Sequence, residues 1–332
     1  MPTDVIGSGL AGQVAALALR RQGHEVRIWG QPERSPTRAI ALSAPSVAYL
    51  TQLCPAVVEL GAPIEHIHVS RQGRFGRTLL NAQDHGQANF GRVIGNDELS
   101  EALDQALVAE RIDEQVDTLT PGWSINQRHS DFVVLAASAP GLMKQAGISY
   151  EQPRMSGDLW VAIGTGATPG TAYERFTPSG PLAILPMGQG RASLVWQVAH
   201  DVSDIAQINA AIGHRVRLSG IEHQARFPIR LHRAHSLARP GLAVIGNASQ
   251  FLHPVAGQGF NLILRQIQLM VQHDLATFNT RALADQARWF QTTRALAQVF
   301  QPQIPLQGLA LLALQAKPWL KSAFVSQFME GA

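Results

Sequence analysis

The sequence predicts an α/β fold with a doubly wound, mostly parallel sheet, a separate antiparallel β-sheet region and C-terminal helices. Three observations predict it. A short strand at the start of the chain leads through a glycine-rich turn into a helix and a second strand. The stretch from Trp160 to Val198 reads as β-like runs broken by turn residues. Near residue 242 the chain returns to a strand, a loop and a helix, so the first unit is discontinuous.

The first unit follows the order strand, turn, helix, strand. The first strand ends at Asp4-Val5-Ile6, and Gly23 ends the helix before a second strand over residues 25–29. One face of the helix is apolar and carries Leu10, Val14 and Leu17. This order favours a parallel sheet of the Rossmann-like type.

Further elements are expected along the chain. A helix over residues 97–109 precedes a buried strand over 132–136, with little room for strands between them. The run Phe176 to Pro181 breaks two β-like runs, and a strand over 242–245 leads to a helix beginning near Gly257. From Thr280 onward the pattern is helical.

These elements predict three regions. A discontinuous nucleotide-binding domain comprises residues 1–65, 91–150 and 235–280. A second domain, built on the antiparallel sheet, comprises residues 66–90 and 151–234. Residues 281–332 form a C-terminal helical region.

The composition excludes several classes of function. The balance of 45% hydrophobic and 15% charged residues is that of a globular protein with a sizeable core. Cys54 is the only cysteine, which excludes an internal disulfide, and no His/Cys cluster has metal-ligand spacing. The net charge of +3 comes from scattered arginines, so nucleic-acid binding is not expected. No apolar run is long enough to span a membrane, and no export signal precedes the first strand; a cytoplasmic protein is expected.

The glycine turn has the spacing of a dinucleotide site. Gly7 allows the turn, Gly9 lets a pyrophosphate approach, and Gly12 lets helix and strand pack closely. The amides of Leu10 and Ala11 at the start of the helix belong to the same site. A purely structural glycine turn is the alternative. Gly30 stands where an acidic residue usually binds ribose, and Glu33 follows a few residues later, either as a substitute or as a solvated loop charge.

A second glycine-containing segment runs from Gly246 to Leu262. A strand delivers a loop that ends at a helix start, where backbone N–H groups face an electron-rich ring or a phosphate. Asn247 is a candidate hydrogen-bond donor to such a ligand. A ligand-free strand-loop-helix is the alternative. The candidate cofactor-binding residues of this segment are Gly246, Asn247, Pro254, Gly257, Gly259, Phe260 and Asn261.

Taken together, these segments resemble the FAD-dependent monooxygenases of ubiquinone biosynthesis, most closely the 2-polyprenyl-6-methoxyphenol hydroxylase branch. The resemblance runs almost end to end. Asn247 and Gln250 are similar to that branch in particular. Other matching stretches are Arg38 to Ser43, Ile67 to Ser70 with Gly73 and Gly76, Ala172 to Thr177 through Pro186, Phe227 to Ile229, and Pro305, Pro318 to Lys321 and Phe328-Met329.

The resemblance implies roles for particular residues. Arg38 would lie beside the ribityl-phosphate region of FAD, unless it is a surface arginine. His253 and Pro254 would lie at the reactive edge of the flavin, where His253 could assist deprotonation of a phenol; a packed or solvent-facing histidine is the alternative. Trp196, Phe176 and Phe227 would line an aromatic substrate pocket, although sheet core is the usual role of such residues.

The resemblance also implies an activity. FAD would be reduced by NAD(P)H and would use O2 to hydroxylate a small prenylated phenol. The prenyl tail of the substrate would be reached from the lipid phase. The apolar run Leu306 to Leu314, with Lys317 and Lys321, would contact the inner face of a membrane peripherally. The same run could instead be a core or dimer-packing helix. A homo-oligomer or a quinone-biosynthesis complex is expected.

Some positions depart from the family pattern. Ala137 and Ser138 stand where the family has an Asp-Gly pair associated with FAD and NADPH, and Ile263 and Gln266 stand where Gly and Asp are common. With Gly30, these departures leave open an alternative: a shortened, catalytically impaired paralogue acting as a non-enzymatic partner in a quinone-biosynthesis assembly. A flavoenzyme with another reaction, such as double-bond reduction, is a third reading.

Overall fold

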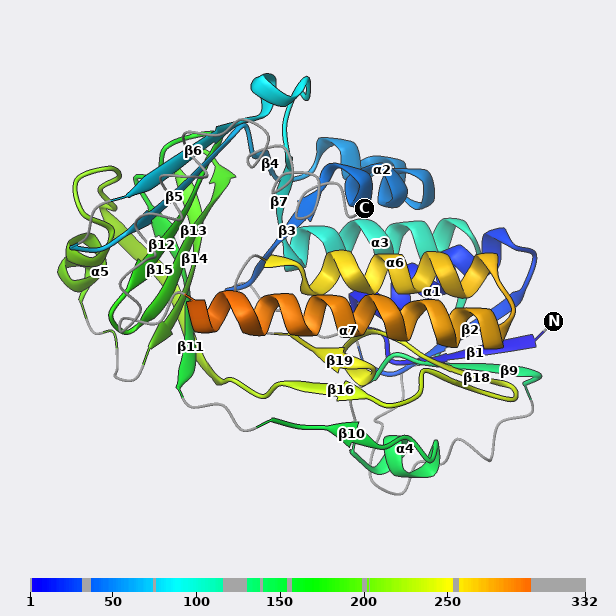
Figure 1. Ribbon diagram of the computed structural model, residues 1–332. Helices are drawn as coiled ribbons and strands as arrows, with labels where there is room; N and C mark the ends of the chain where they lie inside the picture. Colours follow the sequence, from blue (N-terminus) through cyan, green and yellow to red (C-terminus); the bar gives the residue numbers. More distant parts are fainter. Residues whose placement is uncertain are drawn as a thin grey trace.

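A parallel sheet with its helices forms one end of the molecule, and a large antiparallel sheet forms the other (Figure 1). We describe the chain from a computed structural model. The description covers residues 2–31, 37–73, 76–115, 130–137, 140–153, 157–198, 202, 204–252 and 257–299. His253, Pro254, Ser138, Glu33 and the apolar run 306–314 lie outside these residues.

The first sheet has the strand order β17-β18-β9-β1-β2-β8. Every neighbouring pair is parallel except β17 and β18. Parallel strands end at the same edge, so the loops after β1, β2, β9 and β18 meet there. The strands are β1 (Pro2–Ile6), β2 (Glu25–Trp29), β8 (Asp113–Gln115), β9 (Phe132–Leu135), β17 (Ala238–Arg239) and β18 (Leu242–Val244). Strand β8 occupies the interval in which no further strand was expected.

The two faces of this sheet are covered differently (Figure 1). Helices cover one face: α1 (Leu10–Arg21), α2 (Ala44–Leu53), α3 (Asn96–Ala109), α6 (Gly259–Gln272) and α7 (Leu275–Val299). The other face carries α4 (Pro140–Gln145) and a small antiparallel sheet of β10 (Tyr150–Glu151), β16 (His232–Ala234) and β19 (Gln250–Phe251). The predicted α/β class is confirmed, with a thin β-layer on the second face. Helix α7 begins five residues before the expected Thr280.

Asp4 is a polar residue in the middle of β1, and its carboxylate is fully buried. It accepts hydrogen bonds from Arg27 Nε at 3.0 Å and from Trp29 Nε1 at 2.9 Å, both on the adjacent strand β2. Because a buried carboxylate is tolerated when charged and polar donors satisfy it, this strand forms despite its polar residue.

The second sheet has seven strands in the order β15-β11-β14-β13-β12-β5-β6. Strand β5 pairs in parallel with β12, which brings the early segment 66–81 into the same sheet as residues 158–228. Strand β16, at residues 232–234, and Glu151 of β10 pair in the small sheet of the other unit, although the expected bounds place them in the second domain. The strands are β5 (His66–Arg71), β6 (Arg77–Asn81), β11 (Asp158–Thr165), β12 (Thr171–Thr177), β13 (Gly180–Gly188), β14 (Arg191–Val198) and β15 (Gly220–Pro228).

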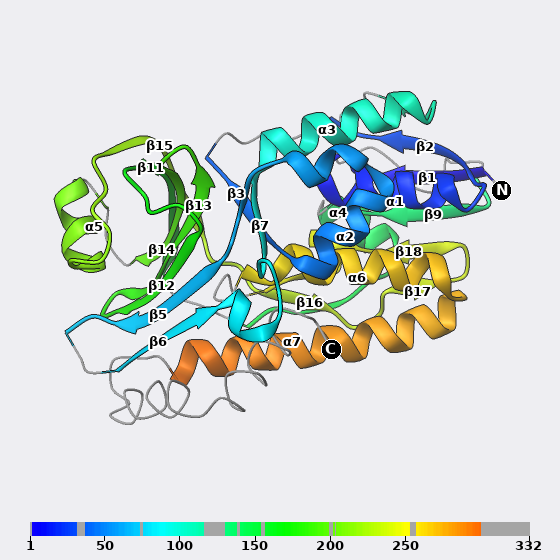
Figure 2. The same ribbon diagram turned by 90° about the horizontal axis from the view of Figure 1, so that it is seen from above.

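The seven-stranded sheet has an inner face toward the parallel sheet and an outer face that carries α5 (Ile205–Ile212) (Figure 2). Side chains alternate between the two faces. Trp160, Leu194 and Trp196 pack against α5 on the outer face. Ile67, Ala172 and Phe176 pack on the inner face. A third sheet adjoins this inner face: β3 (Ala39–Ser43), β7 (Gly91–Gly95) and β4 (Ala62–Pro63).

Short 3-10 turns complete the described elements: η1 (Pro55–Glu59), η2 (Ala82–His85) and η4 (Gly246–Ala248). Within the described residues, no helix combines the length and apolarity needed to cross a membrane.

Candidate functional site

The glycine turn lies at the carboxyl end of β1, at the edge where the parallel strands end. Gly7 has a φ of 116°, and its N–H donates to Trp29 O at 2.7 Å. A side chain on Gly9 would meet no atom within 4 Å, so this position faces open space. No side chain caps α1, and its first turn holds no acidic residue. The first backbone N–H groups of α1, including those of Leu10 and Ala11, therefore lack intrahelical acceptors. Together with the positive end of the helix dipole, they face a space that a phosphate can enter.

Gly12 has a different role from Gly9. A Cβ at this position would lie 1.7 Å from Gly7 O and 3.5 Å from a methyl group of Val5. Helix α1 therefore lies too close to the turn for any side chain at Gly12.

Gly12→Ala is accordingly expected to destabilise the folded protein by about 3 kcal/mol, because a methyl group overlaps a backbone oxygen that cannot move freely. Urea unfolding measures this change. A midpoint equal to that of the unaltered protein would contradict the close approach of helix and turn.

Ser8 and Gly30 face each other beside the turn. A Cβ on Gly30 would lie 3.1 Å from Ser8 N and 3.2 Å from Ser8 Oγ, so a carboxylate side chain there would need the turn to shift. Ser8 Oγ is buried and has no hydrogen-bond partner among the described residues. A buried hydroxyl without a partner is costly, and a ligand oxygen in the turn would satisfy it.

The second glycine segment contacts the first. Gly246, with a φ of 66°, follows β18, and a Cβ on it would lie 2.9 Å from the Cβ of Ala11. Its N–H donates to Oε1 of the buried Gln266 at 3.3 Å, and Ser249 Oγ donates to the same oxygen at 3.1 Å. Gln266, a departure from the family pattern, thus supports the backbone of this segment. Asn247 is exposed, and its carbonyl accepts from His232 Nε2 at 2.8 Å.

Helix α6 begins beside this segment without a side-chain cap and without an acidic residue in its first turn. A side chain on Gly259 would meet no atom within 4 Å, and Gly257 has a φ of 60°. Phe260 is half-buried against the main core. The start of α6 is therefore a second place where backbone donors face open space.

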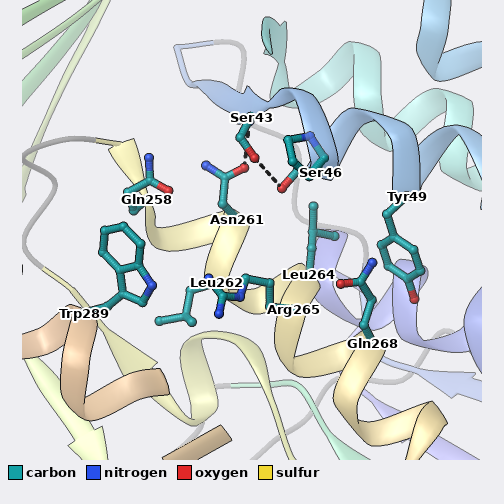
Figure 3. Close-up of a pocket in the computed structure, with 11 residues that line it drawn as sticks. Ser43, Ser46, Tyr49, Gln258, Asn261, Leu262, Leu264, Arg265, Gln268 and Trp289 are labelled. Atoms are coloured by element: carbon teal, nitrogen blue, oxygen red, sulfur yellow. Dashed lines mark hydrogen bonds between the residues drawn. The ribbon is translucent and has the colours of Figure 1, made fainter. Parts of the chain in front are cut away.

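The side-chain amide of Asn261, a residue predicted to bind the cofactor, forms hydrogen bonds with backbone groups. Its Oδ1 accepts from Ser43 N at 2.9 Å, and its Nδ2 donates to Ala41 O at 3.1 Å. Figure 3 shows the side chain pointing from α6 toward Ser43. The side chain of Asn261 therefore fixes the start of α6 against β3.

A pocket of about 180 Å³ opens beside Asn261, between α2, α6 and α7 (Figure 3). Tyr49 lines it, and burial raises the pKa of this phenol to about 12. Arg265 also lines it and pairs with Asp285 at 2.7 Å. The pocket belongs to the helix layer, whereas the glycine segments lie at the strand ends.

Arg38 lies at the start of β3, close to both sheets. Its guanidinium carbon is 5.6 Å from the ring centre of Phe227 on β15, and its carbonyl accepts from Asn96 N at 2.9 Å. Among the described residues it makes no ion pair. Its donors are therefore available to a phosphate or another anion. Phe227 is 38% exposed, whereas Trp196 is buried in the apolar cluster that includes residues of α5 on the outer face.

Glu174 is a buried titratable residue that was not singled out from the sequence. It lies on β12 between Ala172 and Phe176, which both point to the inner face, so it points there too. Its Oε1 is buried and has no partner among the described residues. Burial raises the pKa of this carboxyl to about 7. The sequence signal is a lone acidic residue, Glu174, that alternates with the apolar Ala172 and Phe176 along a strand.

The turn and the two helix starts fit a dinucleotide cofactor. The open space at Gly9 and Gly259, the uncapped helices and the orphaned hydroxyl of Ser8 all suit a pyrophosphate lying along the edge of the sheet. An acidic partner for the ribose is missing at Gly30.

No family model matches the chain. Curated relatives nevertheless align over most of its length. The 3-demethoxyubiquinol 3-hydroxylase of Escherichia coli is 27% identical over 311 residues, covering 81% of this chain and 79% of the relative. The mitochondrial ubiquinone biosynthesis monooxygenase COQ6 of Mus musculus is 24% identical over 373 residues, covering 84% of this chain and 76% of the relative.

Solved structures show the same fold. The p-nitrophenol 4-monooxygenase PnpA of Pseudomonas putida DLL-E4 superimposes with a TM-score of 0.78 at 11% identity, covering 99% of this chain and 97% of that one. The flavin-dependent brominase Bmp2 gives a TM-score of 0.76 at 12% identity, covering 100% and 94%. Because a hydroxylase and a brominase share this fold, the fold alone does not define the reaction. The 2-polyprenyl-6-methoxyphenol branch stays a prediction. The chain is thus similar in sequence to hydroxylases and monooxygenases of ubiquinone biosynthesis and shares the fold of flavin-dependent monooxygenases.

Proposed function

We propose that the chain is an FAD-dependent aromatic-ring hydroxylase acting on a small phenolic precursor of ubiquinone, with a prenylated methoxyphenol as the specific substrate. The observation that carries the proposal is the contact between the two glycine segments, where Gly246 meets Ala11 at the carboxyl edge of the parallel sheet. Relatives named as a 3-demethoxyubiquinol 3-hydroxylase and a ubiquinone biosynthesis monooxygenase, aligned over most of their length, support the same reaction.

Named residues would hold the cofactor. Gly7, Gly9 and the first amides of α1 would take the pyrophosphate, and the start of α6 near Gly259 would face the flavin ring. Arg38 would supply charged donors between the two sheets. When bound, FAD supplies the oxygen-transfer chemistry with NAD(P)H as reductant and O2 as co-substrate.

The protein would bind the ring and move a proton. The inner face of the seven-stranded sheet offers apolar residues such as Phe176 and Leu185, which exclude water from the ring. Glu174 lies among them, and its carboxylate would accept the proton of the ring hydroxyl, which makes the ring more electron-rich. The carboxylate form exists above a pKa of about 7, so turnover would rise with pH through neutrality.

The location and assembly of the protein belong to the same proposal. A prenylated substrate partitions into lipid, so the enzyme would act in the cytoplasm as a peripheral protein on the inner face of a membrane. A homo-oligomer or a complex with other quinone-biosynthesis proteins would bring successive sites close together.

A second candidate is the catalytically impaired paralogue. The close approach of Gly30 to Ser8 favours it, because the turn has no room for the usual ribose-binding carboxylate without a shift. Such a protein would bind FAD weakly and serve as a partner for active enzymes.

A visible spectrum of the purified protein separates the two. We expect a yellow protein whose flavin absorbance is bleached by NADPH, with NADPH oxidation stimulated by a prenylated methoxyphenol in detergent micelles. Product analysis should show one added oxygen atom, and omission of the phenol gives the uncoupled rate as the control. A colourless protein that takes up no added FAD would exclude the hydroxylase and support the paralogue.

A further inference from the structure

A wide groove crosses the outer face of the seven-stranded sheet, away from the glycine turns. It is about 1360 Å³ in volume and is lined by β5, β6, β12 and the segment that follows α5. Figures 1 and 2 show α5 over one part of this face and β5 and β6 extending beyond it. The apolar cluster around α5 is built mainly from β11, β13 and β14, with Tyr173 of β12 and Ile221 of β15 packed against it. The eight-residue helix is too short to cover the remaining strands, which leaves the groove.

The groove is strongly basic. Four arginines line it: Arg71 and Arg77 at the β5–β6 hairpin, Arg175 on β12 and Arg215 after α5. Three histidines, His66, His68 and His214, also line it. Among its described lining residues none is acidic, and neither Arg77 nor Arg215 has a carboxylate partner in the described part of the chain. Positive charges on opposing walls of one concave surface raise the local concentration of anions.

Arg175 is held in place at the centre of the groove. Its Nε donates to Ala211 O, in the last turn of α5, at 2.6 Å, and its Nη1 donates to Ser70 Oγ at 3.1 Å. Burial and the nearby charge of Arg215 both lower its pKa. The two guanidinium groups repel each other, and an anion between them would relieve that repulsion.

The floor of the groove contains a buried histidine without partners. His68 is 6% exposed, and neither Nδ1 nor Nε2 has a hydrogen-bond partner among the described residues. Nδ1 of His66, two residues earlier on the same face, is also buried without a partner. The ring centre of His68 lies 5.7 Å from that of Tyr173, and this contact restricts the orientation of the His68 ring. Buried polar atoms left without hydrogen bonds are costly, and they are common where a ligand supplies the missing partner.

We propose that this groove is a second binding site, for a ligand that carries two or more linked phosphate groups. Arginine pairs with phosphate oxygens through parallel N–H donors, and the four arginines, from β5, β6, β12 and the segment after α5, offer more donors than one phosphate group can accept from. The volume suits a ligand of nucleotide size. A recessed histidine floor suits a discrete ligand that reaches inward, whereas a membrane surface would need a flat or protruding face. The ligand would lie on the opposite face of the sheet from the glycine turns, so it would regulate or anchor the protein rather than react.

Titration calorimetry with inorganic tripolyphosphate tests the proposal on the full chain, loaded with FAD and freed of unbound cofactor so that no free FAD competes for the groove. We expect saturable binding that weakens at least about tenfold for each of Arg77→Glu and Arg215→Glu, because each removes a charged donor and adds repulsion. Arg217→Glu is the matched control: it makes the same charge change at an exposed position two residues from Arg215, outside the groove lining. Its affinity should stay within about threefold.

His68→Phe gives an independent readout. The phenyl ring keeps the packing against Tyr173 but removes both orphaned nitrogens, so tripolyphosphate binding should weaken while the Tm stays equal or rises. A lower Tm would show that His68 serves the fold and would overturn its role in binding.

Three further results would overturn the proposal. The first is the absence of tripolyphosphate binding. The second is tripolyphosphate binding that is unaffected when Arg77→Glu and Arg215→Glu are combined. The third is arginine-dependent sedimentation with phosphatidylglycerol vesicles, or arginine-dependent binding of polyglutamate, without any binding of tripolyphosphate. The vesicle and polyglutamate results would assign the groove to a membrane or to an acidic protein. None of these outcomes depends on whether the chain hydroxylates a phenol, because the assays measure binding alone.

Discussion

Gly9→Glu is expected to abolish FAD retention while leaving the protein folded. The space above Gly9 is open, and its φ of −72° is accessible to any residue, so the side chain can be accommodated in the empty turn. In the presence of FAD the same side chain would occupy the pyrophosphate space and place a carboxylate against two negative charges. One lost phosphate contact with added repulsion costs several kilocalories per mole, which corresponds to about a hundredfold or greater loss of affinity.

The flavin content of the purified variant, measured from its visible spectrum after FAD incubation, checks this result. Gln22→Glu is the matched control, because it adds the same charge at the exposed C-terminal end of α1. The control should keep its flavin. An equal flavin content in a folded Gly9→Glu protein would show that the cofactor does not lie across this turn.

Glu174→Gln should lower kcat by about a hundredfold to a thousandfold, because removal of a positioned general base typically has an effect of this size. The amide retains the shape of the carboxyl but cannot accept the proton of the phenol. The rate of the unaltered enzyme should rise with pH through about 7, the pKa to which burial raises this carboxyl, and the variant should lack that rise. FAD content should not change. Glu222→Gln is the matched control, since Glu222 is an exposed residue of β15 paired with Arg191 at 3.0 Å.

Stability provides a second readout at Glu174. Its pKa in the folded protein lies above its ordinary value of 4.5, so the folded state keeps a proton that the unfolded chain releases between these two pH values. The free energy of unfolding therefore falls as pH rises through this window. The full loss of stability caused by the buried, ionised Glu174 is reached above about pH 7. Glu174→Gln should stabilise the protein at pH 8 more than at pH 4. A variant with unaltered turnover and an unaltered pH profile would remove Glu174 from the reaction.

Local signals in the sequence were sufficient for several elements and for the first glycine turn. The spacing of Gly7, Gly9 and Gly12 after a strand predicted a helix start at Leu10, and the structure shows it. Strand β8 was missed because three residues carry too little pattern to distinguish a strand from a loop. Trp196 was assigned to the substrate pocket because its residue type is common there. The face to which it points depends on the register of β14 against its neighbours.

By itself the sequence determined the α/β class, a parallel sheet built from discontinuous parts of the chain and the two glycine segments, because backbone geometry at glycine and side-chain periodicity are local properties. Only the tertiary structure decided which residues share a surface. It placed Gly246 against Ala11, Asn261 against Ser43, and Glu174 on the inner face of the sheet. It also joined arginines from β5, β6, β12 and the segment after α5 into one groove. The physical reason is that burial, hydrogen-bond satisfaction and pKa depend on neighbours brought together from distant parts of the chain, which no local pattern encodes.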